Sequence, residues 1–298
     1  MVGKGLLVEE REVRLRGGTV RYRETGEGDP VVFVHGLLVN GGLWRGVVAR
    51  LSEGFRCIVP DWPLGSHGVA MDAGADLSFG GITRMVVDFL DALGLEEVTL
   101  VGNDTGGAIC QFVASYPERV ERLVLTNCDA FDNFLPPVLR YVQWGAHVPG
   151  FVSVMGAVLR VRALRRLPIT FGWLTKRPIE EQVLDSYLAP VTGDAGVRRD
   201  LGKFLRDISP RHTLAVAEKL PGFEGPVLLA WAPEDKLFPF EHAEGLAARF
   251  PDATLRNIPD SWAFVPEDGP ERLAEEIEAF LLSRTRGEGA PRDARDAS

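Results

Sequence analysis

Cysteine is scarce in this sequence. The three cysteines among 298 residues, Cys57, Cys110 and Cys128, lie inside apolar segments and show no C-x-x-C spacing. An odd number of thiols without that spacing argues against a disulfide framework and against a cysteine-based metal site. We therefore expect buried free thiols in a reducing compartment.

Long hydrophobic runs and an excess of positive charge are also missing. No window holds about eighteen uninterrupted apolar residues, and the N-terminal stretch MVGKGLLVEEREVRL carries too many charges for a signal peptide. The 33 basic and 42 acidic residues give a net charge of −9, and the basic residues are scattered. This balance predicts a cytoplasmic protein with no affinity for nucleic acid or for an anionic membrane.

Cofactor motifs are absent as well. Neither G-x-x-x-x-G-K-[ST] nor G-x-G-x-x-G after a strand occurs, so no cofactor is expected. The chain is 45% apolar and 25% charged, which is ordinary for a globular protein with one large α/β domain or two small ones.

Short continuous apolar runs alternate with helical patterns along most of the chain. Such runs are typical of parallel strands covered on both faces, and five occur: PVVFVHG, RCIVPD, VTLVGND, RLVLTNCD and PVLLAWAPED. Before them, EVRLRGGTVRYRETG alternates apolar and polar residues around Gly17-Gly18 and predicts a β-hairpin. GITRMVVDFLDALG and PERLAEEIEAFLLSR have the spacing of helices with one apolar face. This alternation predicts an α/β fold with a mostly parallel sheet and helices on both faces.

The pattern changes between about residues 131 and 221, where Pro-bounded helical pieces follow one another with no clear strand. We predict that residues 1–130 and 222–284 form the core domain, that residues 131–221 form a helical lid, and that residues 285–298 are a disordered tail. The predicted lid falls between two strands. It would therefore lie over the C-terminal ends of the strands, where open α/β sheets bind their ligands.

The segment LVGNDTGGAICQF runs from an apolar strand through a Gly-bounded turn directly into a helix. Its core, GNDTG, fits a nucleophile elbow of the form G-x-nucleophile-x-G, with Asp104 at the apex of the turn. Glycine is needed where the backbone of a strained turn approaches its neighbours closely. The alternative is that Asp104 only caps the helix that follows, since Asp is a favoured N-cap residue.

Together with its neighbouring motifs, this segment resembles the α/β-hydrolase superfamily, in particular the branch with an Asp nucleophile that includes haloalkane dehalogenases and epoxide hydrolases. The resemblance covers roughly residues 19–282. His35-Gly36 after the strand VVFV resembles the H-G oxyanion loop of the family. The resemblance implies that the backbone N–H groups of Leu37 and Thr105 form an oxyanion or leaving-group hole, with His35 holding the loop.

The stretch APEDKLFP resembles the family's acid loop, G-x-x-D-x-x-x-P, and places Asp235 in the position of the triad acid. The alternative for Asp235 is a turn residue or a helix cap. Because the resemblance accounts for this loop, we do not interpret Glu234, Asp235 and His242 as a metal site. The loop DWPLGSH corresponds to the family's D-x-x-G-x-G, and His67 stands where a small residue is usual.

A histidine is missing where the resemblance requires one. Relatives end a strand with a pattern of the type I-P-x-x-G-H-F, and this chain reads IPDSWAF, with Ala263 at the histidine position and Trp262 at the glycine position. Without a general base, an ester formed on Asp104 would accumulate. A mutation made to trap that ester would change one residue only, so we interpret the double change as natural.

Three hypotheses follow. In the first, the protein is a hydrolase of epoxides, alkyl halides or esters in which another group supplies the base, with His67 as the first candidate and His147 and His212 behind it. In the second, Asp104 is an acid or base in a lyase, isomerase or cyclase. In the third, the pocket only binds a ligand. A haloalkane dehalogenase would carry Trp directly after the nucleophile to hold the halide, whereas this chain carries Thr105.

The expected ligand is a small hydrophobic molecule, and a homodimer stays open. Lid tyrosines of epoxide hydrolases donate to the epoxide oxygen, and two tyrosines fall in the predicted lid. Aromatic residues there, with Phe171 and Trp173 among them, are candidate walls of the pocket. Besides Asp104, Asp235 and His67, the candidate site residues are His35, Leu37, Thr105, Tyr141, Trp144, Tyr187 and Trp262.

Overall fold

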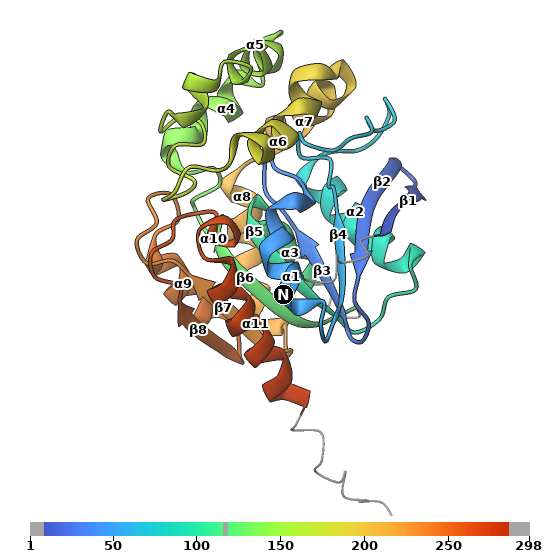
Figure 1. Ribbon diagram of the computed structural model, residues 1–298, viewed down its shortest axis with the longest axis vertical. Helices are drawn as coiled ribbons and strands as arrows, with labels where there is room; N and C mark the ends of the chain where they lie inside the picture. Colours follow the sequence, from blue (N-terminus) through green and yellow to red (C-terminus); the bar gives the residue numbers. More distant parts are fainter. Residues whose placement is uncertain (1–8, 116–118, 286–298) are drawn as a thin grey trace, which may run out of the picture.

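Eight strands form one sheet in the computed structural model, which describes residues 9–115 and 119–285 (Figure 1). Their order across the sheet is β1-β2-β4-β3-β5-β6-β7-β8. The strands are β1 (Glu9–Leu15), β2 (Gly18–Thr25), β3 (Pro30–Val34), β4 (Arg56–Pro60), β5 (Val98–Asp104), β6 (Val120–Cys128), β7 (Val227–Trp231) and β8 (Ala253–Asn257).

The sheet is antiparallel at one edge and parallel elsewhere. β1 and β2 form the predicted hairpin, with Leu15 opposite Gly18, and β2 pairs antiparallel with β4. All pairs from β4 to β8 are parallel. The five apolar runs correspond to β3 to β7, as predicted. β8 has no apolar run, because it is an edge strand whose residues are half-buried or exposed.

Helices lie on both faces of the sheet (Figure 1), as the alternating pattern predicted. α1 packs against α11, and α2 packs against α3. The core helices and turns are η1 (Gly41–Trp44), α1 (Arg45–Leu51), α2 (Phe79–Ala92), α3 (Thr105–Ala114), α9 (Phe240–Ala247), α10 (Val265–Asp268) and α11 (Pro270–Thr285).

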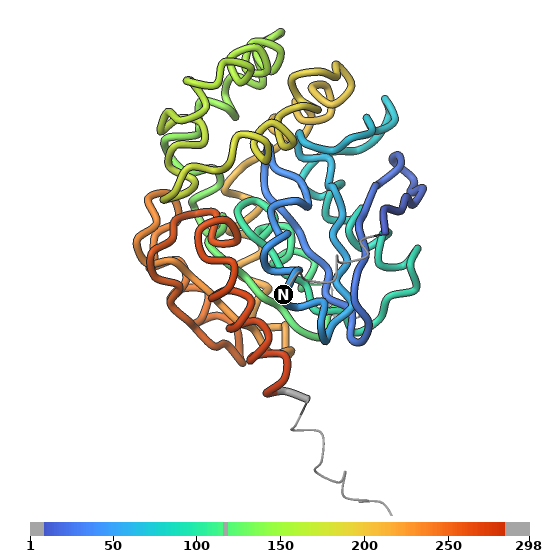
Figure 2. The backbone as a smooth tube through the Cα atoms, in the orientation of Figure 1, coloured from blue at the N-terminus to red at the C-terminus, as the bar shows by residue number. Residues whose placement is uncertain are grey.

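Only helical elements lie between β6 and β7 in the part of the chain that is described. Figure 2 shows this segment, in green and yellow, forming the upper part of the molecule above the sheet. Its elements are η2 (Pro137–Leu139), α4 (Arg140–Gly145), α5 (Phe151–Leu159), η3 (Arg162–Arg166), α6 (Glu181–Gly193), α7 (Ala195–Asp207), α8 (Pro210–Ala217) and η4 (Leu220–Gly222).

Three sequence predictions concern segments and thiols outside the site. All three cysteines are free and buried, as expected. The predicted tail lies outside the described residues, except for the end of α11. Among residues 9–115 and 119–285, no helix has the length and apolarity that crossing a membrane requires.

Candidate active site

Asp104 lies at a strained turn between β5 and α3. Its φ of 55° and ψ of −134° belong to a region that non-glycine residues rarely adopt. The side chain does not make the capping hydrogen bond of an N-cap residue. The alternative that Asp104 serves only to cap α3 therefore has no support in this geometry.

Glycines around Asp104 let three backbone segments approach closely. A Cβ added to Gly106 would lie 2.2 Å from the carbonyl oxygen of Val34, and one added to Gly107 would lie 2.3 Å from the Cβ of Cys128. A Cβ on Gly102 would lie 2.8 Å from the Cα of Gly107. The turn therefore depends on glycine at these positions, as the elbow pattern predicted.

Gly106→Ala is expected to lower the free energy of unfolding by about 3 kcal/mol or more, because the added methyl group meets backbone atoms that cannot rotate away. The matched control is Gly80→Ala in α2, where an added Cβ has nothing within 4 Å. That change should be neutral or stabilising by about 0.5–1 kcal/mol. Denaturant unfolding of the two variants checks this, and equal stabilities would contradict the close packing of the elbow.

Backbone donors converge on the carboxylate of Asp104. The N–H of Leu37 donates to Oδ2 over 3.1 Å, and the N–H of Thr105 also bonds the carboxylate. Burial raises the pKa of Asp104 to about 7, and these two hydrogen bonds oppose the rise. A Cβ on Gly36 would lie 1.9 Å from Oδ2, so glycine makes room for the carboxylate. The backbone N–H groups of Leu37 and Thr105 thus both meet the Asp104 carboxylate.

Asp104 borders an apolar cavity of about 290 Å³. The only other polar side chains at the cavity are those of Tyr141 and Thr170 among the described lining residues. Core residues and helical-segment residues both contribute to the lining, which consists of Leu37, Leu38, Asp104, Leu135, Leu139, Tyr141, Val142, Phe151, Val154, Met155, Val158, Leu159, Leu167, Ile169, Thr170, Phe171 and Leu174. This composition suits a small hydrophobic ligand.

Asp235 follows β7 and is held by two donors. Its Oδ2 accepts from Nδ2 of Asn127 over 2.7 Å, and its Oδ1 accepts from the N–H of Leu237 over 2.9 Å. Burial raises the pKa of Asp235 to about 7. The structure brings Asp235 close enough to Asp104 to raise the pKa of that carboxylate further. The side chain of Asp235 thus bonds the amide of Asn127, whereas the acid of a catalytic triad bonds the imidazole of a histidine.

A third buried carboxylate, Asp129, was missed by the sequence analysis. It follows β6, its side chain is fully buried, and Oδ2 accepts from the hydroxyl of Thr105 over 3.0 Å. Oδ1 has no hydrogen-bond partner among the described residues. Burial and the charge of Asp104 raise its pKa well above the usual range. The available signal was its position directly after an apolar strand, the same position that drew attention to Asp104.

None of the five histidines of the sequence is among the described residues that line the Asp104 cavity. His35 accepts from the N–H of Trp62 over 2.8 Å, and burial lowers the pKa of His35 to about 4. This bond holds the loop that carries Leu37. His67 lies 3.3 Å from Oδ2 of Asp200 on α7 and does not border the Asp104 cavity.

The weaker histidine candidates lie elsewhere too. His212 bonds the carbonyl oxygen of Asp207 and stacks on Phe79, and His242 packs against Phe131. His147 is exposed. The hypothesis that His67, His147 or His212 replaces the missing base therefore receives no support from these positions, because the imidazoles of all three meet other partners or solvent.

The loop that carries Ala263 is buried and is held by hydrogen bonds on two sides. Ala263 has no exposed surface, and its carbonyl oxygen accepts from the side chain of Asn103, the residue before Asp104. The next N–H, that of Phe264, donates to the carbonyl oxygen of Leu174 over 2.7 Å. Leu174 in turn lines the Asp104 cavity. The loop is thus bonded to the elbow on one side and to the helical segment on the other.

The predicted aromatic residues of the pocket are divided. Tyr141 lines the cavity, but its hydroxyl donates to the carbonyl oxygen of Ile169. Tyr187 is buried away from the cavity, and its hydroxyl donates to Glu267. Trp144 is 67% exposed and lies outside the cavity lining. The structure therefore brings Tyr141 to the cavity that Asp104 borders, but not Tyr187 or Trp144, because those side chains point to Glu267 and to solvent.

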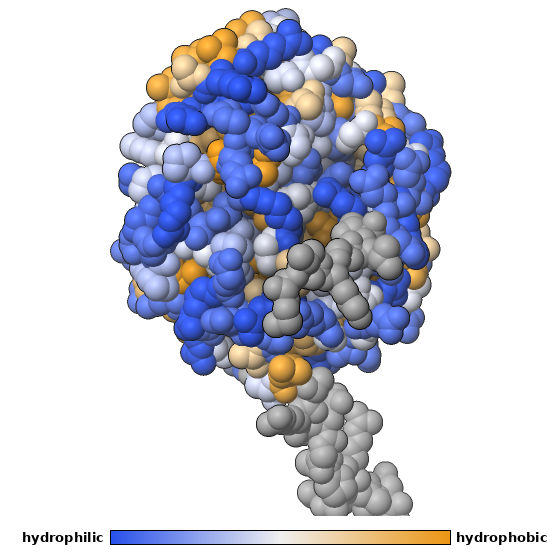
Figure 3. Space-filling model, viewed as in Figure 1, coloured by the Kyte–Doolittle hydropathy of each residue, from blue (hydrophilic) through white to orange (hydrophobic). Residues whose placement is uncertain are grey.

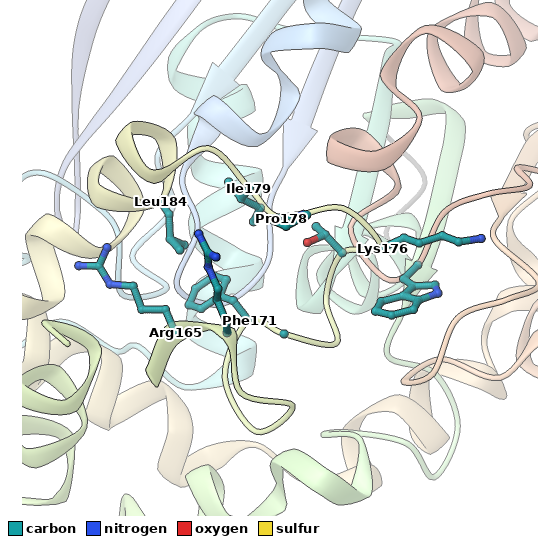
Figure 4. A pocket seen from close by; sticks show the side chains of 10 residues that line it. Arg165, Phe171, Lys176, Pro178, Ile179 and Leu184 are labelled. Atoms are coloured by element: carbon teal, nitrogen blue, oxygen red, sulfur yellow. The ribbon is translucent and has the colours of Figure 1, made fainter. Parts of the chain in front are cut away.

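Trp262 borders a second, smaller pocket of about 200 Å³ (Figure 4). The ammonium nitrogen of Lys236 lies 3.7 Å from the centroid of the Trp262 ring. The cations of this pocket are neutralised, since Arg165 pairs with Asp185 and Lys176 pairs with Asp260. Phe171 borders both pockets. Trp262 is thus close to the site but not in the Asp104 cavity.

No group of three His, Cys, Asp or Glu side chains with metal-binding geometry occurs among residues 9–115 and 119–285. The chemistry available at the Asp104 cavity is that of a buried carboxylate facing an apolar space, with two backbone donors beside it and two further carboxylates nearby.

Comparisons with known proteins agree with the fold. Residues 29–176 match a family model described as alpha/beta hydrolase fold. The chain is 30% identical over 266 residues to haloalkane dehalogenase 2 of Mycobacterium tuberculosis, a match that covers 87% of this chain and 90% of that protein. It is 28% identical over 278 residues to cis-3-alkyl-4-alkyloxetan-2-one decarboxylase of Shewanella oneidensis, covering 89% and 86%.

A solved structure shows the same fold at lower identity. The haloalkane dehalogenase DbeA from Bradyrhizobium elkani superposes with a TM-score of 0.79 and 20% identity, covering 94% of this chain and 99% of that one.

Proposed function

Because the chain belongs to the α/β-hydrolase superfamily and has its fold, we propose that it is an enzyme that uses Asp104 as a nucleophile on a small apolar substrate. The observation that carries the proposal is the position of Asp104 at a strained elbow, with its carboxylate in an apolar cavity beside two N–H donors. Residues 131–221 act as the lid over this cavity.

The first step follows from this geometry. The carboxylate of Asp104 attacks an electrophilic alkyl carbon and forms an alkyl ester. The bond that breaks gives its electron pair to the halide, which leaves as an anion, or to the epoxide oxygen, which takes up a proton from solvent. In this ester the oxygen that does not carry the alkyl group takes the place of the present Oδ2 and stays bonded to Leu37. An apolar cavity favours the step, since it strips water from the attacking carboxylate.

The fate of that ester distinguishes this chain from an ordinary hydrolase. Hydrolysis requires a base that activates water. Ala263 stands at the histidine position, and the five histidines of the sequence meet other partners or solvent. With an alkyl halide or an epoxide, the ester on Asp104 should therefore persist.

A β-lactone avoids the need for water, and the oxetanone decarboxylase among the relatives favours it as a second candidate substrate. Attack of Asp104 on C4 of an oxetan-2-one breaks the ring C–O bond and leaves a carboxylate on C3. Loss of carbon dioxide then supplies the electron pair of a C3–C4 double bond and expels the Asp104 carboxylate. The cycle consumes no water and needs no proton, so a missing histidine does not stop it.

Intact-protein mass spectrometry tests the proposal. After incubation with an alkyl bromide, we expect a stable mass increase of one alkyl group in place of hydrogen, localised to Asp104 by peptide mapping. A 3,4-dialkyl-oxetan-2-one should instead give an alkene and carbon dioxide, with no adduct left on the protein. If an alkyl bromide, an epoxide and an oxetan-2-one all give no adduct and no product, nucleophilic attack by Asp104 is refuted. A protein that only binds a ligand is then the surviving hypothesis.

A further inference from the structure

Exposed apolar side chains are unevenly distributed along the described part of the chain. Of the exposed large hydrophobic residues, most belong to residues 144–169, namely Trp144, Val148, Val154, Val158, Val161, Leu167 and Ile169. In Figure 3 hydrophobic surface gathers at the top of the view, where Figure 1 places α5. We call these seven residues the apolar face. Contiguous apolar surface of this kind marks a contact with a protein or a membrane.

The apolar face is continuous with the mouth of the Asp104 cavity. Four of its members, Val154, Val158, Leu167 and Ile169, are both exposed and part of the cavity lining. Val154 and Val158 are one helical turn apart on α5. Whatever covers this face therefore also covers the opening through which an apolar ligand reaches the cavity.

The same part of the chain is basic. Residues 133–179 contain seven Lys and Arg residues and no Asp or Glu, in a chain of net charge −9. Five of the seven pair with carboxylates outside the segment, among them Glu181 and Asp185 on α6. The overall net charge predicted no affinity for an anionic membrane, but an average over the whole chain does not describe this face.

Four arginines near the apolar face have no carboxylate partner in the described part of the chain. Arg140 and Arg206 bond the carbonyl oxygens of Leu135 and Ala146. Arg160 and Arg198 share the carbonyl oxygen of Thr192. Two of these arginines lie directly beside the apolar residues. Arg206 bonds Ala146, which lies between Trp144 and Val148 in the sequence, and Arg160 directly follows α5.

A groove on this side combines the two chemistries. His147, Val148, Arg198 and Arg206 line it together. Arginines that bond only carbonyl oxygens keep donors for phosphate, and an exposed tryptophan is suited to the boundary between lipid headgroups and acyl chains.

We propose that the apolar face and its four arginines form a docking surface for an anionic lipid bilayer. Valine, isoleucine, leucine and tryptophan side chains enter the interface, the arginines meet lipid phosphates, and the cavity mouth faces the acyl region. A second copy of the chain fits less well. A symmetric contact would set arginine against arginine, and residues 133–179 offer no carboxylate to oppose them.

Vesicle sedimentation tests this proposal without reference to catalysis. The full-length protein should sediment with vesicles of phosphatidylcholine containing about one third phosphatidylglycerol, should bind phosphatidylcholine alone weakly, and should be released by salt. Trp144→Ser/Val148→Ser and Arg160→Glu/Arg206→Glu should each weaken binding by about tenfold or more. Their matched controls on other faces are Leu282→Ser and Arg84→Glu, which should bind as the wild type does.

Two outcomes would overturn the proposal: equal binding by the two double variants and the two control variants, and no binding of the wild type to anionic vesicles. If the wild type does not bind vesicles but forms a dimer in analytical ultracentrifugation that Trp144→Ser dissociates, the apolar face is assigned to a second copy. Circular dichroism should show that all variants are folded, since the replaced side chains are exposed.

Discussion

Asp104→Asn is expected to abolish the covalent adduct and the release of alkene, with a loss of about 10³-fold or more in either rate, and to make the protein more stable at pH 8. The loss of activity follows because an amide is a very poor nucleophile. The gain in stability follows because burial raises the pKa of Asp104 from 3.8 to about 7, so the folded protein at pH 8 holds a charge that the cavity disfavours.

A carboxyl group whose pKa is raised by folding favours the folded state while it is protonated, and this contribution disappears as the pH rises through about 7. A rise of this size corresponds to about 4 kcal/mol. The free energy of unfolding of Asp104→Asn should therefore exceed that of the wild type by about 2–4 kcal/mol at pH 8, and the difference should shrink toward pH 4.

Asp132→Asn is the matched control, because the side chain of Asp132 is 82% exposed. It should keep the activity of the wild type, and its stability should differ from that of the wild type only through the loss of the Asp132–His242 pair, whose charge opposes the lowering of the His242 pKa by burial. Thermal unfolding between pH 4 and 8 measures one half of the prediction, and mass spectrometry the other. A variant that is inactive but no more stable at pH 8 would contradict the buried, charge-disfavouring site. A variant that keeps the chemistry would exclude Asp104 as the nucleophile.

The architecture was predictable because it depends on local patterns. The five apolar runs became β3 to β7, the alternation around Gly17-Gly18 became a hairpin, and the helical spacing became α2 and α11. Each signal comes from residues that are neighbours in sequence and fill one face or both faces of an element. β8 lacked that signal, since its edge position leaves residues such as Arg256 and Asn257 exposed.

The elbow was predictable for the same reason, whereas the partners of the polar side chains were not. His67 meets Asp200, which lies 133 residues further along the chain. Asp235, which follows β7, meets Asn127 of the neighbouring strand β6. Tyr187 meets Glu267 in the same way. No local pattern predicts such pairs, because each joins residues that are far apart in the sequence and meet only when the strands pair or the helical segment packs on the core. For this reason the sequence drew attention to the carboxylate but did not give the partners of the other polar side chains.

Trp262→Gly/Ala263→His is expected not to create a hydrolase. Ala263 is completely buried, and the bonds from Asn103 and Leu174 hold its loop on two sides. Both oxygens of Asp235 already accept hydrogen bonds, so a new imidazole would have to share a carboxylate that Asn127 and Leu237 hold in another orientation. We expect the alkyl ester on Asp104 to persist and the protein to lose about 1–3 kcal/mol of stability, because a larger side chain enters a closed loop.

Trp262→Gly/Ala263→Leu provides the matched control, since leucine adds a side chain of similar size without a base. Both double variants lose the contact between Trp262 and Lys236 in the same way. Equal persistence of the ester in the two variants, followed by mass spectrometry over time, is the expected result. Faster release of the alcohol by the histidine variant would show that water, Asp104 and the new imidazole still have a productive geometry. In that case the loop at residues 260–264 has lost one catalytic part, and the bonds that now close it arose around an otherwise intact hydrolase site.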